Sequence, residues 1–159
     1  MRIPVVDDKD EIIEYKEREL VVKEIYRVSA LWLTNSKGEV LLAKRSLSKK
    51  QHPGKWGPAV AGTVEESENY EQNIIKEMEE ELGIKDVKFK LGPKQRVSGD
   101  HQHFTQWFTL VLDEYKFIIN EKEVSEIKWW DLEELKKEMK ENPNIFLKSI
   151  QPCLDLFST

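Results

Sequence analysis

The acidic stretch from Gly62 to Ile84 reads GTVEESENYEQNIIKEMEEELGI and holds eight glutamates. Apolar residues recur in it at helical spacing, and Gly83 suits the left-handed conformation that ends many helices. The pattern predicts a helix from about residue 69 to residue 82. The open question is whether its glutamates form a solvated face or hold a cation.

Three of these glutamates share one side of the predicted helix. With Glu77 set at 0° and about 100° per residue, Glu80 lies at about −60° and Glu81 at about +40°. Like charges at these spacings cost about 0.2–0.5 kcal/mol per pair, and Mg²⁺, which prefers oxygen ligands, would reverse that cost. The arc borders the stripe predicted to face the core, which consists of Ile74, Ile75, Met78 and Leu82. A purely solvated acidic face remains the alternative.

The longer spacing resembles a known motif. Five residues separate Gly62 from Glu68, and seven more lead to the run KEMEEELGI, residues 76–84. This resembles the Nudix box, in which glycine, five residues, glutamate and seven residues precede Arg-Glu-aliphatic-x-Glu-Glu-x-Gly-aliphatic. Lys76 replaces the arginine, which keeps the charge but loses the planar fork that can hold a carboxylate bidentately. A weaker resemblance extends from about residue 25 to residue 135.

The resemblance implies a fold, an activity and a set of ligands. The fold would be an α/β (α+β) sandwich of the Nudix type, with helices on both faces of a central mixed β-sheet, formed by residues 1–159 as one domain. The activity would be hydrolysis of a diphosphate linkage in a nucleoside diphosphate joined to another group, with Mg²⁺ or Mn²⁺ as cofactor. Glu68 would support the loop, and Glu77 would either bind metal or help to deprotonate water. The metal ligands would be the Gly62 carbonyl, Glu77, Glu80 and Glu81.

The rest of the chain alternates predicted strands and helices, which favours a sheet covered by helices. An N-terminal strand or hairpin is expected within residues 5–25, and a hairpin from 27 to 46 with its turn at NSKG. A short strand is expected at 59–62, and others at 87–92, 103–112 and 126–130. Residues 131–142 are predicted to form a helix with Asp131 as its N-cap. Residues 144–156 are predicted to be helical, with Pro152 as a kink or break.

A further carboxylate outside the box is expected to act as metal ligand or base. Within residues 120–135, NEKEVSEIKWWDLEEL, Glu123 is the first candidate for this catalytic role and Glu126 the second. The alternative is that both are solvated charges beside a strand.

The stretch KRSLSKKQHPGKW, residues 44–56, also resembles the type 1 isopentenyl-diphosphate isomerases, a branch with the Nudix fold. That resemblance implies that Arg45 and Lys49 contact a substrate diphosphate, although a basic surface loop is the alternative. The isomerase requires Cys-Gly-His-Pro before its helix, and this chain has Ala-Gly-Thr-Val at residues 61–64. An isomerase is therefore a disfavoured alternative, and a non-catalytic nucleotide-sensing domain is another.

Histidines and tryptophans complete the predicted substrate site. His101 and His103 would point to one side of a strand, where they could contact phosphate or metal or transfer protons, or simply be strand-edge residues. Trp56 and Trp107 could stack on a base or sugar, or could pack in the core.

Composition narrows the class of partner. The 159 residues carry a net charge of −5, which argues against a general nucleic-acid binder, and no apolar run approaches the roughly 20 residues that span a bilayer. The start of the chain is too charged for a signal peptide, and the single cysteine, Cys153, suits a reducing cytoplasm. The expected partner is a small diphosphate compound rather than nucleic acid or membrane, and the family resemblance admits a homodimer.

Overall fold

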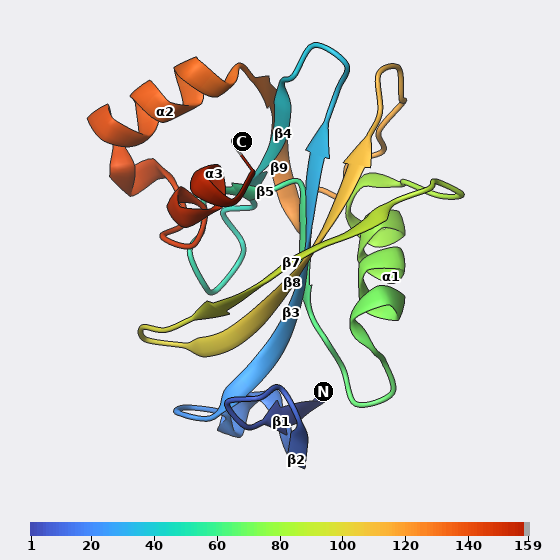
Figure 1. The fold of residues 1–159 in the computed structure, drawn as a ribbon, viewed down its shortest axis with the longest axis vertical. Coiled ribbons are helices and arrows are strands. Elements are labelled where there is room, and N and C mark those ends of the chain that lie inside the picture. The colour runs from blue at the N-terminus through green and yellow to red at the C-terminus, as the bar shows by residue number, and fades with distance from the viewer. Residues whose placement is uncertain (158–159) are drawn as a thin grey trace.

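The computed structural model describes residues 1–157, which form a curled mixed sheet with helices on both faces (Figure 1). The long strand β3 (Ile25–Thr34) runs through its centre and pairs in parallel with β8 (Gln102–Val111). All other strand pairs are antiparallel. The remaining strands are β1 (Arg2–Val6), β2 (Ile12–Glu17), β4 (Val40–Arg45), β5 (Trp56–Pro58), β6 (Val60–Thr63), β7 (Lys90–Val97) and β9 (Val124–Trp130).

Two buried clusters lie on opposite faces of β3 because its side chains alternate between the faces. Leu31 and Leu33 belong to the cluster under α1 (Tyr70–Leu82), whereas Ala30 and Trp32 belong to the cluster under α2 (Leu132–Glu141) and α3 (Gln151–Phe157). Figure 1 shows α1 on one side of the sheet and the other two helices on the opposite side. The predicted α/β/α sandwich is confirmed.

Helix α1 begins and ends with local signals that its own sequence supplies. Asn69 accepts a hydrogen bond from the Gln72 backbone N–H at 2.8 Å, and the Gln72 side chain accepts one from the Asn69 N–H at 2.9 Å. Gly83 ends the helix at φ +65°, a conformation that favours glycine. Three of the four residues predicted for the core stripe are buried, but Ile75 is 48% exposed and lies outside it.

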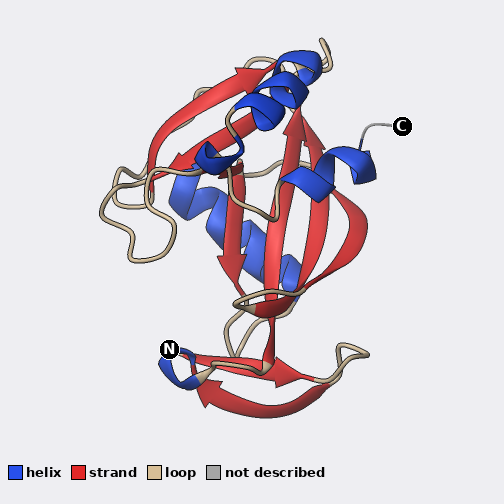
Figure 2. Ribbon diagram, turned by 90° about the vertical axis from the view of Figure 1, so that its left-hand side faces the viewer, coloured by secondary structure: helices blue, strands red, loops and turns tan. Residues whose placement is uncertain are grey.

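The N-terminal hairpin of β1 and β2 lies at one end of the molecule (Figure 2). Its tight turn carries Asp10, whose side chain is 7% exposed and lies 2.8 Å from Arg27 Nε and 2.6 Å from Lys94 Nζ. The Tyr70 hydroxyl donates a third bond to Asp10, at 2.8 Å. These bonds tie the hairpin to β3, β7 and α1. The chain then enters a 3₁₀ turn, Arg18–Leu20, in which Arg18 donates to Thr63 Oγ1 at 3.1 Å.

Two predicted elements differ from the structure. Strand β7 covers residues 90–97 rather than 87–92, and it pairs with β8 through an irregular register between Leu91 and Lys94. Residues 144–156 do not form one helix: a 3₁₀ turn, Pro143–Ile145, and an extended stretch precede α3. Pro152 lies in the first turn of α3, where a missing N–H costs nothing, so it does not interrupt the helix. No helix within residues 1–157 has the length and apolar character needed to cross a membrane.

Candidate active site

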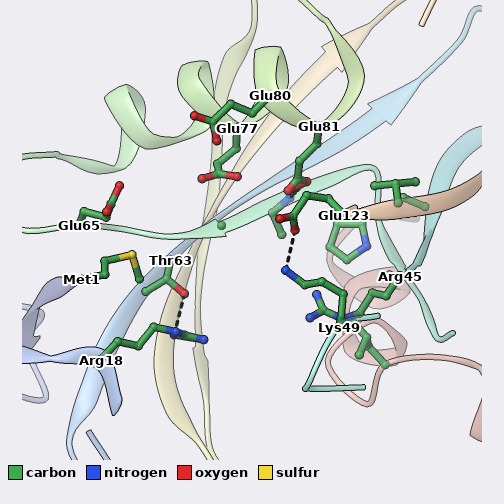
Figure 3. A pocket seen from close by; sticks show the side chains of 17 residues that line it. Met1, Arg18, Arg45, Lys49, Thr63, Glu65, Glu77, Glu80, Glu81 and Glu123 are labelled. Atoms are coloured by element: carbon green, nitrogen blue, oxygen red, sulfur yellow. Dashed lines mark hydrogen bonds and ion pairs between the residues drawn. The ribbon is translucent and has the colours of Figure 1, made fainter. Parts of the chain in front are cut away.

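A cavity of about 300 Å³ lies between α1 and the loops at the ends of β4 and β6 (Figure 3). Carboxylates line one side of it and cations line the other. Glu77, Glu80 and Glu81 come from α1, and Glu123 comes from the turn before β9. Opposite them lie Arg18, Arg45 and Lys49. The structure therefore brings together charged residues that are far apart in the sequence, such as Arg18 and Glu123, which are separated by 105 positions (123 − 18).

The helix glutamates approach the backbone of β6 closely. Glu81 is 8% exposed, and its Oε1 accepts a hydrogen bond from the Ala61 N–H at 3.3 Å. Glu77 lies over Gly62, where a Cβ atom would stand 2.5 Å from Glu77 Cδ. Only glycine leaves room at this position for that side chain. The glycine of the motif at residue 62 is thus explained by the close approach of Glu77, and not by a left-handed φ.

Burial and mutual repulsion make these carboxylates costly to ionise. Burial, followed by the charge of Glu80, raises the pKa of Glu77 to about 7. Burial, followed by the charge of Glu77, raises the pKa of Glu81 well above its ordinary value, although the Ala61 N–H opposes the shift. A cation held between these side chains would remove the repulsion.

Lys76 organises the loop that precedes α1. Its ammonium group lies 2.7 Å from Glu68 Oε2 and 4.0 Å from Glu77 Oε1, and it is hydrogen-bonded to Glu65. Burial alone would raise the pKa of Glu68, but the bonds from Lys76, the Glu65 N–H and Asn73 lower it. Lys76 therefore binds two carboxylates of the loop, Glu65 and Glu68, and lies near a third on the helix, Glu77. It does so without the planar fork of arginine.

The cationic side of the cavity combines one ion-paired lysine with two arginines, which have no ion pair to a carboxylate within residues 1–157. Lys49 Nζ lies 2.6 Å from Glu123 Oε2, which forms an ion pair across the cavity. Arg45 is half-buried and donates from Nε to the Gln51 carbonyl at 3.0 Å, and no carboxylate in residues 1–157 lies within 4.0 Å of its guanidinium. Burial lowers the pKa of Arg45, and the charges of Glu81 and Glu123 oppose that shift. The guanidinium faces the cavity with donors to spare.

The two tryptophans considered as stacking residues are core residues. Trp56 is 7% exposed and packs edge-on against Trp130 at a ring distance of 5.5 Å. Trp107 is 2% exposed and donates from Nε1 to Gln95 at 3.0 Å. Neither lines the cavity. The expectation that Trp56 stacks on substrate stays a prediction, and its burial in the cluster under α2 and α3 favours the alternative of core packing.

The other predicted site residues, Glu126, His101 and His103, lie outside the lining of the carboxylate cavity. Glu126 is exposed on β9 opposite Lys44 and does not line the cavity. His103 is half-buried on β8, where its ring lies 5.3 Å from that of Tyr26. His101 precedes β8 and lines a neighbouring chamber instead. Neither histidine lines the carboxylate cavity, so their contact with substrate stays a prediction.

Arg18 is the principal lining residue that the sequence did not indicate. It is one charge among many in the N-terminal segment, and no motif marks it. Its position depends on the hairpin of β1 and β2, because the 3₁₀ turn that follows β2 brings Arg18 within hydrogen-bond distance of Thr63. Met1 lines the same cavity for the same reason, since its carbonyl accepts from the Arg18 N–H at 2.9 Å, whereas Glu65 lines it from the loop before α1.

The donor set suits a hard divalent cation. The four glutamates supply only oxygen atoms, as Mg²⁺ and Mn²⁺ prefer. Within residues 1–157 no three His, Cys, Asp or Glu side chains already stand close enough to bind one ion. Coordination would therefore require the glutamate side chains to change rotamer and converge, which their mutual repulsion opposes without a cation.

Comparison with known proteins places this site in a family. The family model described as NUDIX domain matches residues 23–149, which includes the whole acidic loop and helix. The chain belongs to the Nudix family. An uncharacterized Nudix hydrolase of Pseudomonas aeruginosa is 42% identical over 74 residues, which cover 46% of this chain and 41% of that protein. An isopentenyl-diphosphate Delta-isomerase of Citrobacter koseri is 43% identical over 53 residues, covering 33% of this chain and 29% of the isomerase.

These matches span less than half the length of the curated Nudix relatives. Solved structures extend the likeness of fold further. A Deinococcus radiodurans protein superimposes with a TM-score of 0.86 at 22% identity, covering 99% of both chains. The NUDIX domain of Shewanella oneidensis NrtR, solved with ADP ribose, gives a TM-score of 0.61 at 19% identity, covering 77% of this chain and 82% of that one. At these identities the comparison establishes the fold alone.

Proposed function

We propose that this Nudix protein is a divalent-metal-dependent hydrolase that cleaves a diphosphate linkage in a nucleoside diphosphate joined to another group. One observation carries the proposal: the four glutamates of the cavity face Arg45 and Lys49 across about 300 Å³. A diphosphate is a dianion or more, so it needs cations on one side and a metal-filled carboxylate cluster on the other. The ADP-ribose complex of the Shewanella domain supports a nucleotide derivative as substrate.

Each residue has a role in this proposal. Glu77, Glu80 and Glu81 would hold Mg²⁺ or Mn²⁺ together with the Gly62 carbonyl, and Glu123 would orient or deprotonate the attacking water. The bound cation would neutralise phosphate charge and lower the pKa of a coordinated water. Arg45 and Lys49 would orient the substrate through charge-assisted hydrogen bonds. Glu68 would keep the loop in place through Lys76.

Isomerase activity is the second candidate, because isomerases are among the relatives. It requires an acidic cysteine beside the substrate. Cys153 is fully buried in the cluster under α2 and α3, and its thiol donates to the Ser149 carbonyl at 3.1 Å. Burial raises the pKa of Cys153 to about 12. This thiol does not line the cavity, so the hydrolase remains our proposal.

The assignment is tested by product analysis. The protein is incubated with Mg²⁺ and a panel that includes ADP-ribose, nucleotide sugars, dinucleotide polyphosphates, nucleoside triphosphates and isopentenyl diphosphate. Glu80→Gln and Glu81→Gln are run beside Glu79→Gln, which changes an exposed glutamate of the same helix. We expect cleavage of a diphosphate linkage that the first two variants lose and the third keeps. Absence of turnover with binding of a nucleotide would support a sensing domain, and formation of dimethylallyl diphosphate would support the isomerase.

We further propose that residues 1–159 act as one domain in the cytoplasm. Strand β1 joins the central sheet through the pairing of Val6 with Ile25, so the hairpin and the site form one unit. A single buried thiol suits a reducing compartment. A homodimer stays a prediction, which sedimentation of the purified chain would check.

A further inference from the structure

A second chamber, of about 580 Å³, adjoins the active-site cavity. The two share three lining residues, Arg18, Arg45 and Lys49, which lie at the boundary between them. The chamber adds Tyr26, Lys50 and His101 to its wall. Its residues come from five parts of the chain: strands β1 and β3, the 3₁₀ turn after β2, the loop after β4 and the loop before β8. Glu19 is the one carboxylate among its described lining residues.

The cations of this chamber are largely unpaired. Arg18 contacts Thr63 Oγ1 and the face of Tyr26, at 5.7 Å from the ring centre, and has no carboxylate partner within residues 1–157. Arg45 likewise makes only its bond to the Gln51 carbonyl. Lys50 forms neither a hydrogen bond nor an ion pair with any residue from 1 to 157. Lys49 alone is neutralised, by Glu123 on the active-site side. Gathering these charges without counter-ions is unfavourable unless an anion binds there.

The pKa values of two further histidines, His103 and His52, are lowered in part by the same positive charges. Burial, followed by the charges of Arg96, His101 and Arg18, lowers the pKa of His103 to about 4. Burial, followed by the charges of Arg45, Lys55 and His101, lowers the pKa of His52. Arg18 and Arg45, which line the chamber, are thus among the charges that disfavour protonation of these rings.

We propose that this chamber binds a phosphate group of the substrate additional to the diphosphate linkage cleaved at the glutamates. Guanidinium groups pair with phosphate oxygens bidentately, and the ammonium group of Lys50 and the Tyr26 hydroxyl supply further donors. Because Arg45 and Lys49 line both spaces, a substrate can lie across them without a gap. The additional group is either the next phosphate of a longer chain or a phosphomonoester elsewhere on the nucleotide. The anion site stands on geometry alone, whereas its role in substrate choice rests on the proposed hydrolase function.

Binding is measured first, on the full chain in EDTA at low salt, by calorimetric titration with inorganic tripolyphosphate. Arg18→Gln and Lys50→Gln are each expected to weaken binding about tenfold, the effect of about 1.4 kcal/mol for one lost charge-assisted bond. Glu19→Gln, which removes the lining carboxylate, is expected to tighten it. Lys37→Gln, in the exposed turn between β3 and β4, changes the net charge equally and should shift binding less than twofold. Lys50 has no partner to lose, so its variant separates anion binding from folding.

Kinetics then distinguish the two sources of the phosphate. ATP is compared with ADP for chain length, and NADP⁺ with NAD⁺ for the phosphomonoester, each as a ratio of kcat/KM in Mg²⁺. Arg18→Gln and Lys50→Gln should lower one of these ratios, and Lys37→Gln should leave both unchanged. The inference is overturned if tripolyphosphate fails to bind, or if the two variants bind it as wild type does. Variant-sensitive binding without turnover would uphold the anion site and refute the hydrolase, whereas turnover with unchanged ratios would uphold the hydrolase and refute the chamber's role in substrate choice.

Discussion

Lys49 Nζ lies 2.6 Å from Glu123 Oε2, so a residue of the proposed phosphate clamp is bonded to the proposed base. The pair joins the loop after β4 to the turn before β9, two segments that adjacent antiparallel strands bring together. A substrate phosphate that attracted Lys49 would release Glu123 toward the helix glutamates. Substrate binding would then free Glu123 to act on the attacking water, because both events involve the same ion pair.

Replacing Glu123 tests this coupling. In Glu123→Gln we expect kcat to fall about 100-fold, the loss typical of a missing general base, with little change in KM. Glu126→Gln is the matched control, because Glu126 is an exposed carboxylate on the same segment that does not line the cavity. Steady-state kinetics on the substrate found in the panel provide the measurement. Equal activity of the two variants would remove Glu123 from the reaction.

Gly62→Ala should damage the site more than the fold. Its Cβ would stand 2.5 Å from Glu77 Cδ, so the glutamate must move and Mg²⁺ binding should weaken at least tenfold. Gly38→Ala should show the opposite pattern, because Gly38 has φ +79° and open space around it. That variant is expected to lose about 1 kcal/mol of stability and keep its metal affinity. Metal titration and urea unfolding of both variants separate the two effects.

Lys76 can be compared directly with the arginine that is usual in the family. Lys76→Met leaves Glu65 and Glu68 without their cation, and we expect a loss of about 1 kcal/mol of stability together with reduced kcat. Lys76→Arg should retain most of both, since it restores a charge that can reach the same carboxylates. If the methionine variant matched wild type in urea unfolding and kcat, Lys76 would have no part in supporting the loop.

The bonds of Asp10, which tie the β1–β2 hairpin to β3, β7 and α1, should be essential for placing Arg18. Asp10→Asn removes the charge that Arg27 and Lys94 share, and breaking such a buried ionic cluster costs about 3 kcal/mol. Asp8→Asn is the control, because Asp8 lies in the same turn with its side chain 92% exposed. Hydrogen exchange of residues 2–20 reports whether the hairpin loosens. Protection unchanged in Asp10→Asn would mean that the strand pairing of β1 suffices to hold the hairpin.

His103 should make the fold sensitive to mild acid. Its folded pKa, about 4, lies below the ordinary histidine value of 6.5 because burial, and then Arg96, disfavour the charged ring. The unfolded chain therefore binds a proton that the folded chain refuses, and stability is lost as pH falls from 6.5 toward 4. The groups facing the ring are Arg96, His101, Arg18 and Tyr26.

Urea unfolding at several pH values measures this effect. In His103→Gln the decline between pH 6.5 and pH 4 should be shallower than in wild type. His101→Gln, at an exposed position just before β8, should fall between the two curves, because it removes only one of the charges that disfavour the protonated His103 ring. A decline of equal slope in His103→Gln would assign the acid sensitivity to other groups.

Predictions from the sequence succeeded where the controlling interactions are local. The helix start near residue 69, the left-handed Gly83 and the side shared by Glu77, Glu80 and Glu81 all follow from contacts within a few residues. The same is true of the Asp131 N-cap. Because the helical period is fixed, the three glutamates lie on one arc of the helix independently of the rest of the chain.

The tertiary structure alone decided which distant residues join that arc. Arg18 and Glu123 reach the cavity through the pairing of β1 with β3 and of β9 with β4, and no local pattern encodes either contact. The burial of Trp56 and Ile75's exposure likewise depend on which neighbours cover each side chain. Residues 62–84 therefore determine the helix and its arc of three glutamates by themselves, because helix geometry is local. The cations that would meet the substrate depend on strand pairing across the whole chain, because only long-range contacts can bring their loops together.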